Sequence, residues 1–462
     1  MKVFFLQDML FEYFGPMYLS AVLKKNGHET EIVIPKDKDY IKELKGAGLV
    51  ALSCMSSGHQ WYLDRAKEIK EQLGIPILFG GPHPTYFPEI IKESQVDYVC
   101  VGEGEYAILD LVNALEQGKD TEHIPNIWTK NNKNDVRPPL DLDTLPFPDR
   151  ELFYKYKFLR NMPTKKFITG RGCPFQCTFC YNHKVQELYS GKGRFVRRTS
   201  PQRAIEEIKL VKEKYPLKTV RFSDDTFAMD KKWFNDFMTI YKKEIHLPFT
   251  FLLRADELDE DSIRLSKEAN CHSVYFGIES GSERIRNEVL KKNIMNKDIY
   301  RTAKLLKKYK IKFGTYNMVG NPTETLEEAF STIQMNIDIK ADVPFCSIIQ
   351  PYPRTKLYDI CIEKGLIKKD FNADDLTTMY EETPMHIENK KEIENLHKLF
   401  YISIKFPFIF PLVKKAIKLP HNPLFNFIFL LSYAHRSFKS FNAGLLDSIK
   451  LGFQLKKTVF KS

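Results

Sequence analysis

The sequence predicts an α/β protein: a doubly wound parallel sheet of the Rossmann-like type, then a partial (β/α)6 TIM-like barrel, then a helical C-terminal region. Three observations predict this fold. Short apolar runs alternate with helical stretches along most of the chain, which is the pattern of parallel sheets. A length of 462 residues exceeds what one hydrophobic core normally supports. Finally, prolines interleaved with acidic residues mark a connector between the halves, at positions 138, 139, 146 and 148.

The first half is predicted to form a Rossmann-like domain over residues 1–135, followed by a linker at 136–160. Strand-like apolar runs cover residues 3–6, 29–34, 49–53, 75–79 and 98–101. Helical stretches cover residues 15–26, 61–73 and 105–116. Glycines follow several of these strands, and parallel sheets bind ligands at the carboxyl ends of their strands. We therefore expect a ligand site where those glycines lie.

Residues 161–370 are predicted to form the barrel of six β/α units. Strand-like runs cover residues 166–169, 219–222, 249–253, 273–278, 313–319 and 344–349. Helical stretches separate them at residues 201–214, 232–243, 261–268, 296–310 and 325–339. Active sites of such barrels lie at the carboxyl ends of the strands, so the residues that follow each strand are the candidates for chemistry.

The basic charge of the chain is concentrated in its C-terminal region, residues 371–462, which we expect to form a helical cap. Residues 398–462 hold eleven Lys or Arg and one acidic residue, which is +10 of the total net charge of +11. A general nucleic-acid-binding surface is therefore not indicated. Four prolines, at 407, 411, 420 and 423, predict short helices. The longest apolar run, residues 425–433, is far shorter than the ~20 residues of a spanning helix. A lid over the substrate channel and a surface that rests on anionic lipid are the two alternatives.

Three cysteines in the order C-x-x-x-C-x-x-C are the strongest chemical signal in the chain. Cys173, Cys177 and Cys180 are close enough for one loop to wrap them around a soft-metal centre. A buried helix face is disfavoured because two glycines and a proline interrupt the segment. Structural zinc with His183 as fourth ligand is a second alternative, but no second ligand pair follows. Three thiolates without a fourth favour an iron–sulfur cluster with one open iron.

This motif, preceded by Gly-Arg-Gly at 170–172 and followed by Tyr181, resembles the cluster loop of the radical S-adenosylmethionine (SAM) superfamily. The resemblance implies a [4Fe–4S] cluster on Cys173, Cys177 and Cys180, and SAM as the source of a 5′-deoxyadenosyl radical. It also implies SAM-binding elements at the strand ends: an acidic loop for the amino group, an arginine for the carboxylate, a glutamate for the ribose or methionine end, and a turn against adenine. The matching residues are Tyr181, Asp224, Asp225, Arg254, Glu279, Gly320 and Glu324. Arg354 departs from the family, since it replaces the glycine of a P-G-T turn.

Two glycine-containing strings in the first half resemble the cobalamin-binding domain that precedes the radical domain in one branch of this superfamily. They are Gly80-Gly-Pro-His-Pro-Thr85 and Val101-Gly-Glu-Gly-Glu105. The resemblance implies that cobalamin contacts Ser53, Gly80, Gly81, His83, Thr85, Gly102 and Glu103. The D-x-H-x-x-G motif of many cobalamin domains is absent after the first strand, so a cobalt without a protein histidine is expected. A domain of this type that binds no cobalamin is the alternative.

The function that this resemblance implies is cobalamin-dependent methyl transfer to an unactivated carbon. An anaerobic oxidative cyclase or rearrangement enzyme on the same scaffold is the alternative, and a non-catalytic metal-binding or regulatory protein is an alternative of another class. We expect a small-molecule or lipid-like substrate, an electron donor of the flavodoxin or ferredoxin type and no nucleic acid. Acid directly follows the first apolar run, which disfavours a signal peptide, so we expect a cytoplasmic protein with peripheral membrane contact as a further option.

Overall fold

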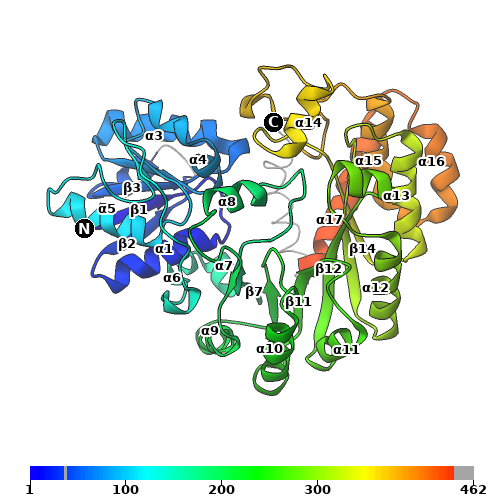
Figure 1. The fold of residues 1–462 in the computed structure, drawn as a ribbon, viewed down its shortest axis with the longest axis horizontal. Coiled ribbons are helices and arrows are strands. Elements are labelled where there is room, and N and C mark those ends of the chain that lie inside the picture. Colours follow the sequence, from blue (N-terminus) through cyan, green and yellow to red (C-terminus); the bar gives the residue numbers. More distant parts are fainter. Residues whose placement is uncertain (36–38, 442–462) are drawn as a thin grey trace. The chain divides into compact units, whose positions relative to one another are not determined.

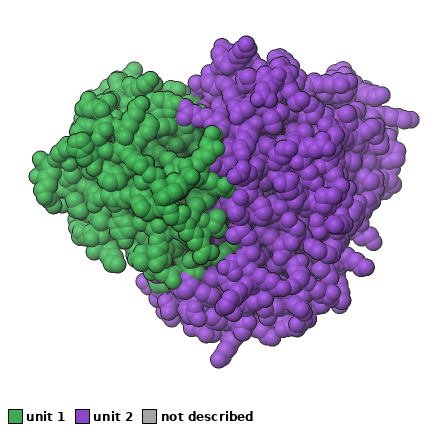
Figure 2. All heavy atoms as spheres, viewed as in Figure 1, with its two compact units in different colours: residues 1–162, 184–199 green, residues 163–183, 200–462 purple. Residues whose placement is uncertain are grey.

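The computed structural model describes residues 1–35 and 39–441, and the chain divides into two compact units (Figure 2). The first unit contains residues 1–162 and 184–199, and the second contains residues 163–183 and the described residues from 200 onward. The main division therefore lies near the end of the expected linker. The return of residues 184–199 to the first unit is not part of that expectation.

The first unit is built on a six-stranded sheet with the order β2-β1-β3-β4-β5-β6 (Figure 1). The strands are β1 (Lys2–Leu6), β2 (Glu29–Val33), β3 (Leu49–Ser53), β4 (Ile77–Gly80), β5 (Tyr98–Cys100) and β6 (Ile127–Trp128). All neighbouring pairs are parallel except β5 and β6. The predicted parallel sheet is confirmed. The antiparallel edge strand β6 was not predicted, because a strand of two residues is too short to be recognised from the sequence.

Helices cover both faces of this sheet, and successive residues of the interior strand β1 are therefore all buried. Phe4 and Leu6 join the cluster that contains α3, while Val3 and Phe5 point to the other face and are equally buried. The helices of this unit are α1 (Phe14–Lys25), α2 (Tyr40–Glu43), α3 (His59–Leu73), α4 (Pro82–Tyr86), α5 (Glu105–Glu116), α6 (Glu151–Tyr154) and α7 (Lys157–Asn161). A further helix, α8 (Asn182–Leu188), begins at the boundary of the two units.

The second unit contains six parallel strands in the order β14-β13-β12-β11-β10-β7, as expected for successive β/α units. They are β7 (Thr164–Phe167), β10 (Thr219–Phe222), β11 (Phe249–Leu253), β12 (Cys271–Glu279), β13 (Lys312–Val319) and β14 (Val343–Ile348). The intervening helices are α9 (Pro201–Lys214), α10 (Lys231–Glu244), α11 (Glu260–Glu268), α12 (Asn296–Lys308) and α13 (Leu326–Asp338), and α14 (Lys356–Glu363) follows β14. Two-residue strands at Gly170–Arg171 (β8) and Arg197–Arg198 (β9) lie outside both sheets.

The curved sheet of the second unit has an outer face under helices and a more open inner face (Figure 1). In β11, Phe249, Phe251 and Leu253 are buried, whereas the alternate residues Thr250 and Leu252 are only partly covered. This alternation is the burial pattern of strands that have one face under helices and the other face less covered. The predicted fold class is therefore confirmed.

The C-terminal helices belong to the second unit and share a core with α13 and β14. They are α15 (Lys390–Lys405), α16 (Phe410–Ala416) and α17 (Pro423–Phe441). The expectation of short helices is wrong for α17, which has 19 residues. Pro423 is its first residue, where no backbone N–H is needed, so this proline starts a helix instead of breaking one. Residues 442–462 lie outside the described part. Within that part, no helix combines the length and the apolar character that crossing a membrane requires.

Candidate active site

The three cysteines lie in a loop between β8 and α8. Gly172 has a φ of +87°, a left-handed conformation that turns the chain into this loop. Thr178 anchors the loop, because its N–H donates to Leu290 O at 3.0 Å and its hydroxyl donates to Val289 O at 2.8 Å. The loop is thus held by the segment that follows β12.

The cysteine thiols are partly buried and need a cationic partner to ionise. Burial raises the pKa of Cys173 to about 12 and also raises the pKa of Cys177 and Cys180. Asn182 brings two N–H groups to Cys180, with its backbone N at 3.5 Å and its Nδ2 at 3.4 Å from Sγ. Such N–H contacts stabilise the charge of metal-bound thiolates. The loop therefore suits thiolates that a bound metal group ionises.

The cysteines fit a cluster better than a single ion. In residues 1–35 and 39–441, no three His, Cys, Asp or Glu side chains converge as the ligands of one metal ion. His183, which would be the fourth ligand in the zinc alternative, places its Nδ1 2.6 Å from Cys180 O. In a [4Fe–4S] cluster each thiolate binds a different iron, so the three sulfur atoms need not meet at one point.

Arg254 follows β11 directly and contacts the cysteine loop. Its guanidinium carbon lies 3.5 Å from the ring centroid of Phe175. Its Nε and Nη2 donate to the two carboxylate oxygens of Asp256, each at 3.1 Å, and Nη2 also donates to Lys292 O at 2.9 Å. These contacts orient the guanidinium beside the loop and leave Nη1 for an anionic ligand.

Glu279, at the end of β12, forms a buried ion pair with Lys292. Glu279 has a φ of +63°, which turns its side chain out of the regular strand alternation. The pair lies directly over Gly277, where an added Cβ would be 1.9 Å from Glu279 Oε1 and 2.4 Å from Lys292 Nζ. Because Lys292 O also accepts from Arg254, the ends of β11 and β12 are joined through one lysine.

The turn after β13 is braced from inside by Glu324. Its Oε2 accepts from the N–H groups of Gly320 at 2.7 Å and Asn321 at 3.1 Å. Its Oε1 accepts from Asn321 Nδ2 at 3.0 Å and from the Ser280 hydroxyl at 3.5 Å. Gly320 has a φ of +78°, so the turn needs a residue without a side chain there. Glu324 therefore holds the shape of the turn, and its carboxylate is used by the protein itself.

The buried position of Glu324 predicts a pH dependence of stability. Burial raises its pKa from the ordinary 4.5 to about 7, although the hydrogen bonds from Asn321 and Gly320 lower it. The folded protein then keeps a proton that the unfolded chain releases, so stability is lost as the pH rises from 4.5 to 7. We expect this decline in urea unfolding of the wild type and its absence in Glu324→Gln. A wild-type stability that rises relative to the variant over this range would contradict the prediction.

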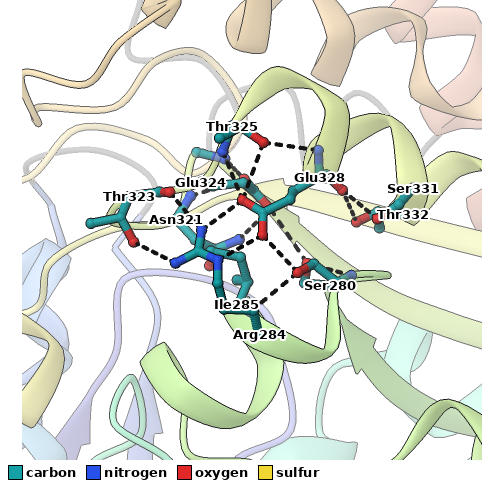
Figure 3. A network of polar contacts seen from close by, with 12 residues as sticks. Ser280, Arg284, Ile285, Asn321, Thr323, Glu324, Thr325, Glu328, Ser331 and Thr332 are labelled. Atoms are coloured by element: carbon teal, nitrogen blue, oxygen red, sulfur yellow. Dashed lines mark hydrogen bonds and ion pairs between the residues drawn. The ribbon is translucent and has the colours of Figure 1, made fainter.

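A second set of polar contacts clamps the same turn to the segment that follows β12 (Figure 3). Arg284 donates to both oxygens of Glu328, at 2.9 and 2.6 Å, and to Thr323 O at 2.8 Å. Glu328 also completes a capping box with Thr325 at the start of α13. Burial alone would raise the pKa of Glu328, but these hydrogen bonds lower it to about 2. The ends of β12 and β13 are thus held together by charge as well as packing.

The two aspartates of the acidic loop after β10 have different surroundings. Asp224 is buried, and its Oδ1 accepts from the N–H of Thr169 at 2.9 Å and the hydroxyl of Thr169 at 2.7 Å. It therefore braces the chain just before the cysteine loop. Asp225 is exposed and lies 3.5 Å from Asn182 Nδ2, next to Cys180. Of the two, Asp225 is the better placed to meet a bound amino group.

Tyr181 connects the cysteine loop to the turn after β14, because its hydroxyl donates to Pro353 O at 2.9 Å. The next residue in that turn, Arg354, has a φ of +70°. The structure thus keeps the left-handed conformation that a glycine would adopt easily, although arginine occupies the position. The departure from the P-G-T pattern changes the side chain and not the backbone shape.

We expect this left-handed position to show in a comparison of two variants. Because a Cβ in this region costs about 1 kcal/mol or more, Arg354→Gly should be more stable to urea than Arg354→Ala by about 1 kcal/mol. The alanine variant is the matched control, since both changes remove the same arginine side chain. An alanine variant that is as stable as the glycine variant would show that the turn is not strained.

In the first unit, the expected cobalamin residues gather at the ends of β3, β4 and β5. Gly81 has a φ of +93°, and a Cβ there would lie 3.1 Å from Cys54 N and 3.2 Å from Ser53 Oγ. The hydroxyl of Thr85 accepts from the N–H of Gly102 at 3.1 Å and donates to Gly81 O at 2.9 Å. The strand ends are therefore closely packed, and the glycine at position 81 leaves no side chain between the backbone segments.

His83 is buried in the same region, between two stacked aromatic side chains. Its ring stacks on His59 at 4.4 Å between centroids and on Phe87 at 4.9 Å, and its Nδ1 lies 3.2 Å from the Ser56 hydroxyl. Stacking and burial fix the orientation of this imidazole. Its assignment to cobalamin stays a prediction.

Glu103 is held within the first unit by the segment 184–199. It forms an ion pair with Arg197 and accepts from the N–H of Leu140 at 3.2 Å. Its own N–H donates to the hydroxyl of Tyr189 at 2.8 Å. These contacts are structural, and a cobalamin contact of Glu103 remains a prediction beside them.

Three residues that the sequence did not point to are part of the second unit's site: Asn182, Arg286 and Lys292. Arg286 is fully buried and donates to Ser280 O at 2.6 Å, to Ile294 O at 2.7 Å and to Asn296. It lies in a single turn of π-helix, Ile285–Val289, which has no periodicity of its own. Only the position of Asn182, two residues after the last cysteine, could have drawn attention.

Comparison with protein families finds both expected domains. The model described as the radical SAM superfamily matches residues 167–335, and that described as the B12 binding domain matches residues 11–112. The first match covers most of the barrel, and the second lies entirely in the first unit. A radical SAM domain implies a [4Fe–4S] cluster and SAM, and a B12-binding domain implies cobalamin.

Curated relatives include methyltransferases and cyclases. An uncharacterized methyltransferase of Pyrococcus horikoshii is 34% identical over 65% of this chain and 66% of its own length. An anaerobic magnesium-protoporphyrin IX monomethyl ester cyclase of Rubrivivax gelatinosus is 25% identical over 74% of this chain and 64% of its own length. The chain thus spans about two thirds of the length of these relatives.

Solved structures share the fold. OxsB, a cobalamin-dependent SAM radical enzyme solved with aqua-cobalamin and SAM bound, has a TM-score of 0.70 at 14% identity and covers 99% of this chain and 75% of its own. TsrM, a radical SAM methyltransferase from Kitasatospora setae, has a TM-score of 0.64 at 16% identity and covers 79% and 77%. Likeness at such identities concerns the fold alone. With both family models matching in the places where the structure forms the two sheets, the chain carries a radical SAM domain preceded by an N-terminal B12-binding domain.

Proposed function

We propose that this protein is a cobalamin-dependent radical SAM methyltransferase that methylates an unactivated carbon. The observation that supports it most directly is the occurrence of a B12-binding domain together with a barrel whose strand ends carry a cysteine loop, an oriented arginine and a buried glutamate. When bound, the three cofactors would supply a radical that removes hydrogen from the substrate and a methyl group that replaces it. The relative named a methyltransferase supports the same assignment.

In this proposal each strand end of the barrel binds one part of SAM. Cys173, Cys177 and Cys180 hold the cluster, and Asp225 receives the amino group beside them. Arg254 binds the carboxylate through Nη1, since its Nε and Nη2 donate to Asp256. Tyr181 and Asp224 hold the chain at and before the cysteine loop. The remaining assigned residues act at the ribose and adenine ends or hold the backbone there: Glu279, Gly320 and Glu324.

The first unit is proposed to bind cobalamin without a histidine ligand to cobalt. The closely packed ends of β3, β4 and β5 support this, together with the missing D-x-H-x-x-G motif. We expect the full-length protein to retain hydroxocobalamin through desalting. Nitrogen hyperfine splitting from a histidine in the cobalt(II) spectrum would refute the ligand assignment, and loss of the corrin would refute the cofactor assignment.

The methyl transfer itself is tested with the full-length protein under anaerobic conditions. The protein, reconstituted with iron, sulfide and cobalamin, is incubated with reductant, SAM carrying a deuterated methyl group and an extract of small molecules and lipids. We expect a product whose mass rises by one deuterated methyl group, formed together with 5′-deoxyadenosine. A variant with Cys177→Ala serves as the control, because it should form neither product.

Oxidative cyclisation is the second candidate function, because an anaerobic cyclase is also among the relatives. The same incubation separates the two. A product that has lost hydrogen and gained no deuterium would favour oxidative cyclisation, while 5′-deoxyadenosine would appear in both cases.

We further propose a small-molecule or lipid-like substrate, a flavodoxin or ferredoxin type of electron donor and a cytoplasmic location with peripheral membrane contact. The C-terminal segment supports the lipid-related part, because it combines basic charge with aromatic and aliphatic residues. No nucleic acid is expected as a partner, since the first 397 residues carry a net charge near zero.

A further inference from the structure

The surface of the C-terminal helices exposes an unusual share of large apolar side chains. Of the fourteen exposed large hydrophobic residues in the described part of the chain, eight lie between Phe406 and Leu431. Phe408 is 81% exposed, Leu412 66% and Leu424 62%. Single exposed apolar residues are normal, but such a concentration within a short stretch marks an interaction surface.

Several of these side chains lie on α16 and on the short segments directly before and after it. Phe408, Leu412 and Leu419 follow one another at intervals of four and seven residues, while Phe410, Val413 and Ile417 face the core. Figure 1 shows α16 at the outer edge of the second unit, beside α15. We name this surface the apolar–basic patch and define it as Phe406, Phe408, Leu412, Lys415, Lys418, Leu419 and Leu424.

The segment that carries the patch bears charge of one sign, and the neighbouring carboxylate of Glu394 is buried and pairs with His421 at 3.2 Å. Residues 395–441 contain no Asp or Glu and seven Lys or Arg. Lys415 and Lys418 are exposed, and each lies within one helical turn of Leu419 or Leu412. The surface is therefore complementary to a partner that is apolar and negatively charged at once.

We propose that the apolar–basic patch docks this protein on the surface of an anionic lipid bilayer. Aromatic and aliphatic side chains flanked by lysines are the composition of helices that lie at the boundary of head groups and acyl chains. The lysines would reach lipid phosphates while their stems cover apolar surface. This inference extends the proposed function, on which the biological role of the patch rests. Docking on a bilayer would bring the enzyme to a lipid-like substrate.

The two protein alternatives are less favourable. A second copy that docked through the same patch would place the lysines of both copies, and no acidic residue of the patch, in one interface, which is electrostatically unfavourable. Interfaces with other proteins are depleted in lysine at their cores. A bilayer with anionic head groups has neither disadvantage.

The test uses the full-length protein and flotation with vesicles of phosphatidylcholine alone or mixed with phosphatidylglycerol. We expect binding to the mixed vesicles that weakens with salt. The variant Phe408→Ser with Leu412→Ser and Leu419→Ser should bind at least about tenfold more weakly, because it removes most of the inserted apolar surface. The variant Lys415→Glu with Lys418→Glu should bind at least about 30-fold more weakly.

Control variants carry changes of the same two kinds elsewhere on the second unit. Leu210 and Met295 are 40% and 44% exposed, so Leu210→Ser with Met295→Ser removes apolar surface outside the patch. Lys212→Glu with Lys214→Glu reverses two exposed charges on α9. Both control variants should bind vesicles as the wild type does.

Formation of 5′-deoxyadenosine in the absence of lipid should be unchanged in all four variants, which separates failure of this inference from failure of the proposed chemistry. Three results would overturn the inference: no binding of the wild type to mixed vesicles, equal binding of patch and control variants, or a patch variant whose only effect is a smaller mass in solution. The last result would assign the patch to a second copy of the chain.

Discussion

Cys177→Ala is expected to abolish the formation of 5′-deoxyadenosine and to lower the bound iron and sulfide to background. The loop offers three cysteines for three irons, and the neighbouring polar side chains of Thr178 and Asn182 cannot replace a thiolate. The same loss is expected for Cys173→Ala and Cys180→Ala. The protein should remain folded, because the three thiols are only partly buried and carry no disulfide.

A suitable control is Cys271→Ala, which removes a thiol from the opposite, amino-terminal end of β12. Cys271 is buried, so its loss should cost about 1 kcal/mol of stability and leave the cluster content intact. SAM cleavage that persists in any of the three loop variants would remove the cluster assignment. Iron analysis, sulfide analysis and product chromatography on the same samples decide between these outcomes.

Arg286→Leu is expected to lower the free energy of unfolding by about 3–5 kcal/mol, which is the largest loss of stability that we predict for a single substitution in this protein. The arginine is fully buried, and burial lowers its pKa to about 10, so it remains charged at neutral pH. A leucine would leave the carbonyl oxygen of Ser280 buried without the arginine donor, and Ile294 O would keep only its hydrogen bond from Asn287 Nδ2. Because Ser280 follows Glu279 directly, the KM for SAM should also rise.

The neighbouring Arg284 provides the control, since it lies two residues earlier and its side chain is 41% exposed. Arg284→Leu should cost about 1 kcal/mol, as exposed ion pairs usually do. Arg286→Lys should recover only part of the loss, because an ammonium group cannot reach three acceptors that a planar guanidinium reaches together. Urea unfolding of the three variants measures the order. Equal losses at positions 284 and 286 would contradict the structural role assigned to Arg286.

The fold could be predicted closely from the sequence because its signals are local. Each strand of the barrel lies within two residues of its expected limits, and α9 begins and ends at the expected residues. Alternation of apolar residues and helix periodicity act over about ten residues, so they can be recognised without knowing the tertiary structure. The cysteine motif is local in the same sense, because its spacing alone brings three thiols into one loop.

The sequence by itself thus determined the two parallel sheets, the cluster loop and the strand ends at which chemistry is expected. Only the tertiary structure decided which charges meet there. The side chain of Lys292 pairs with Glu279, 13 residues away in the sequence, and its carbonyl oxygen accepts from Arg254, 38 residues away. No local sequence pattern selects either partner. The same holds for the return of residues 184–199 to the first unit and for α17, whose apolar run continues into a long helix because β14 and α15 cover one side of it. Contacts between distant segments depend on how whole elements pack, and packing is a property of the folded chain.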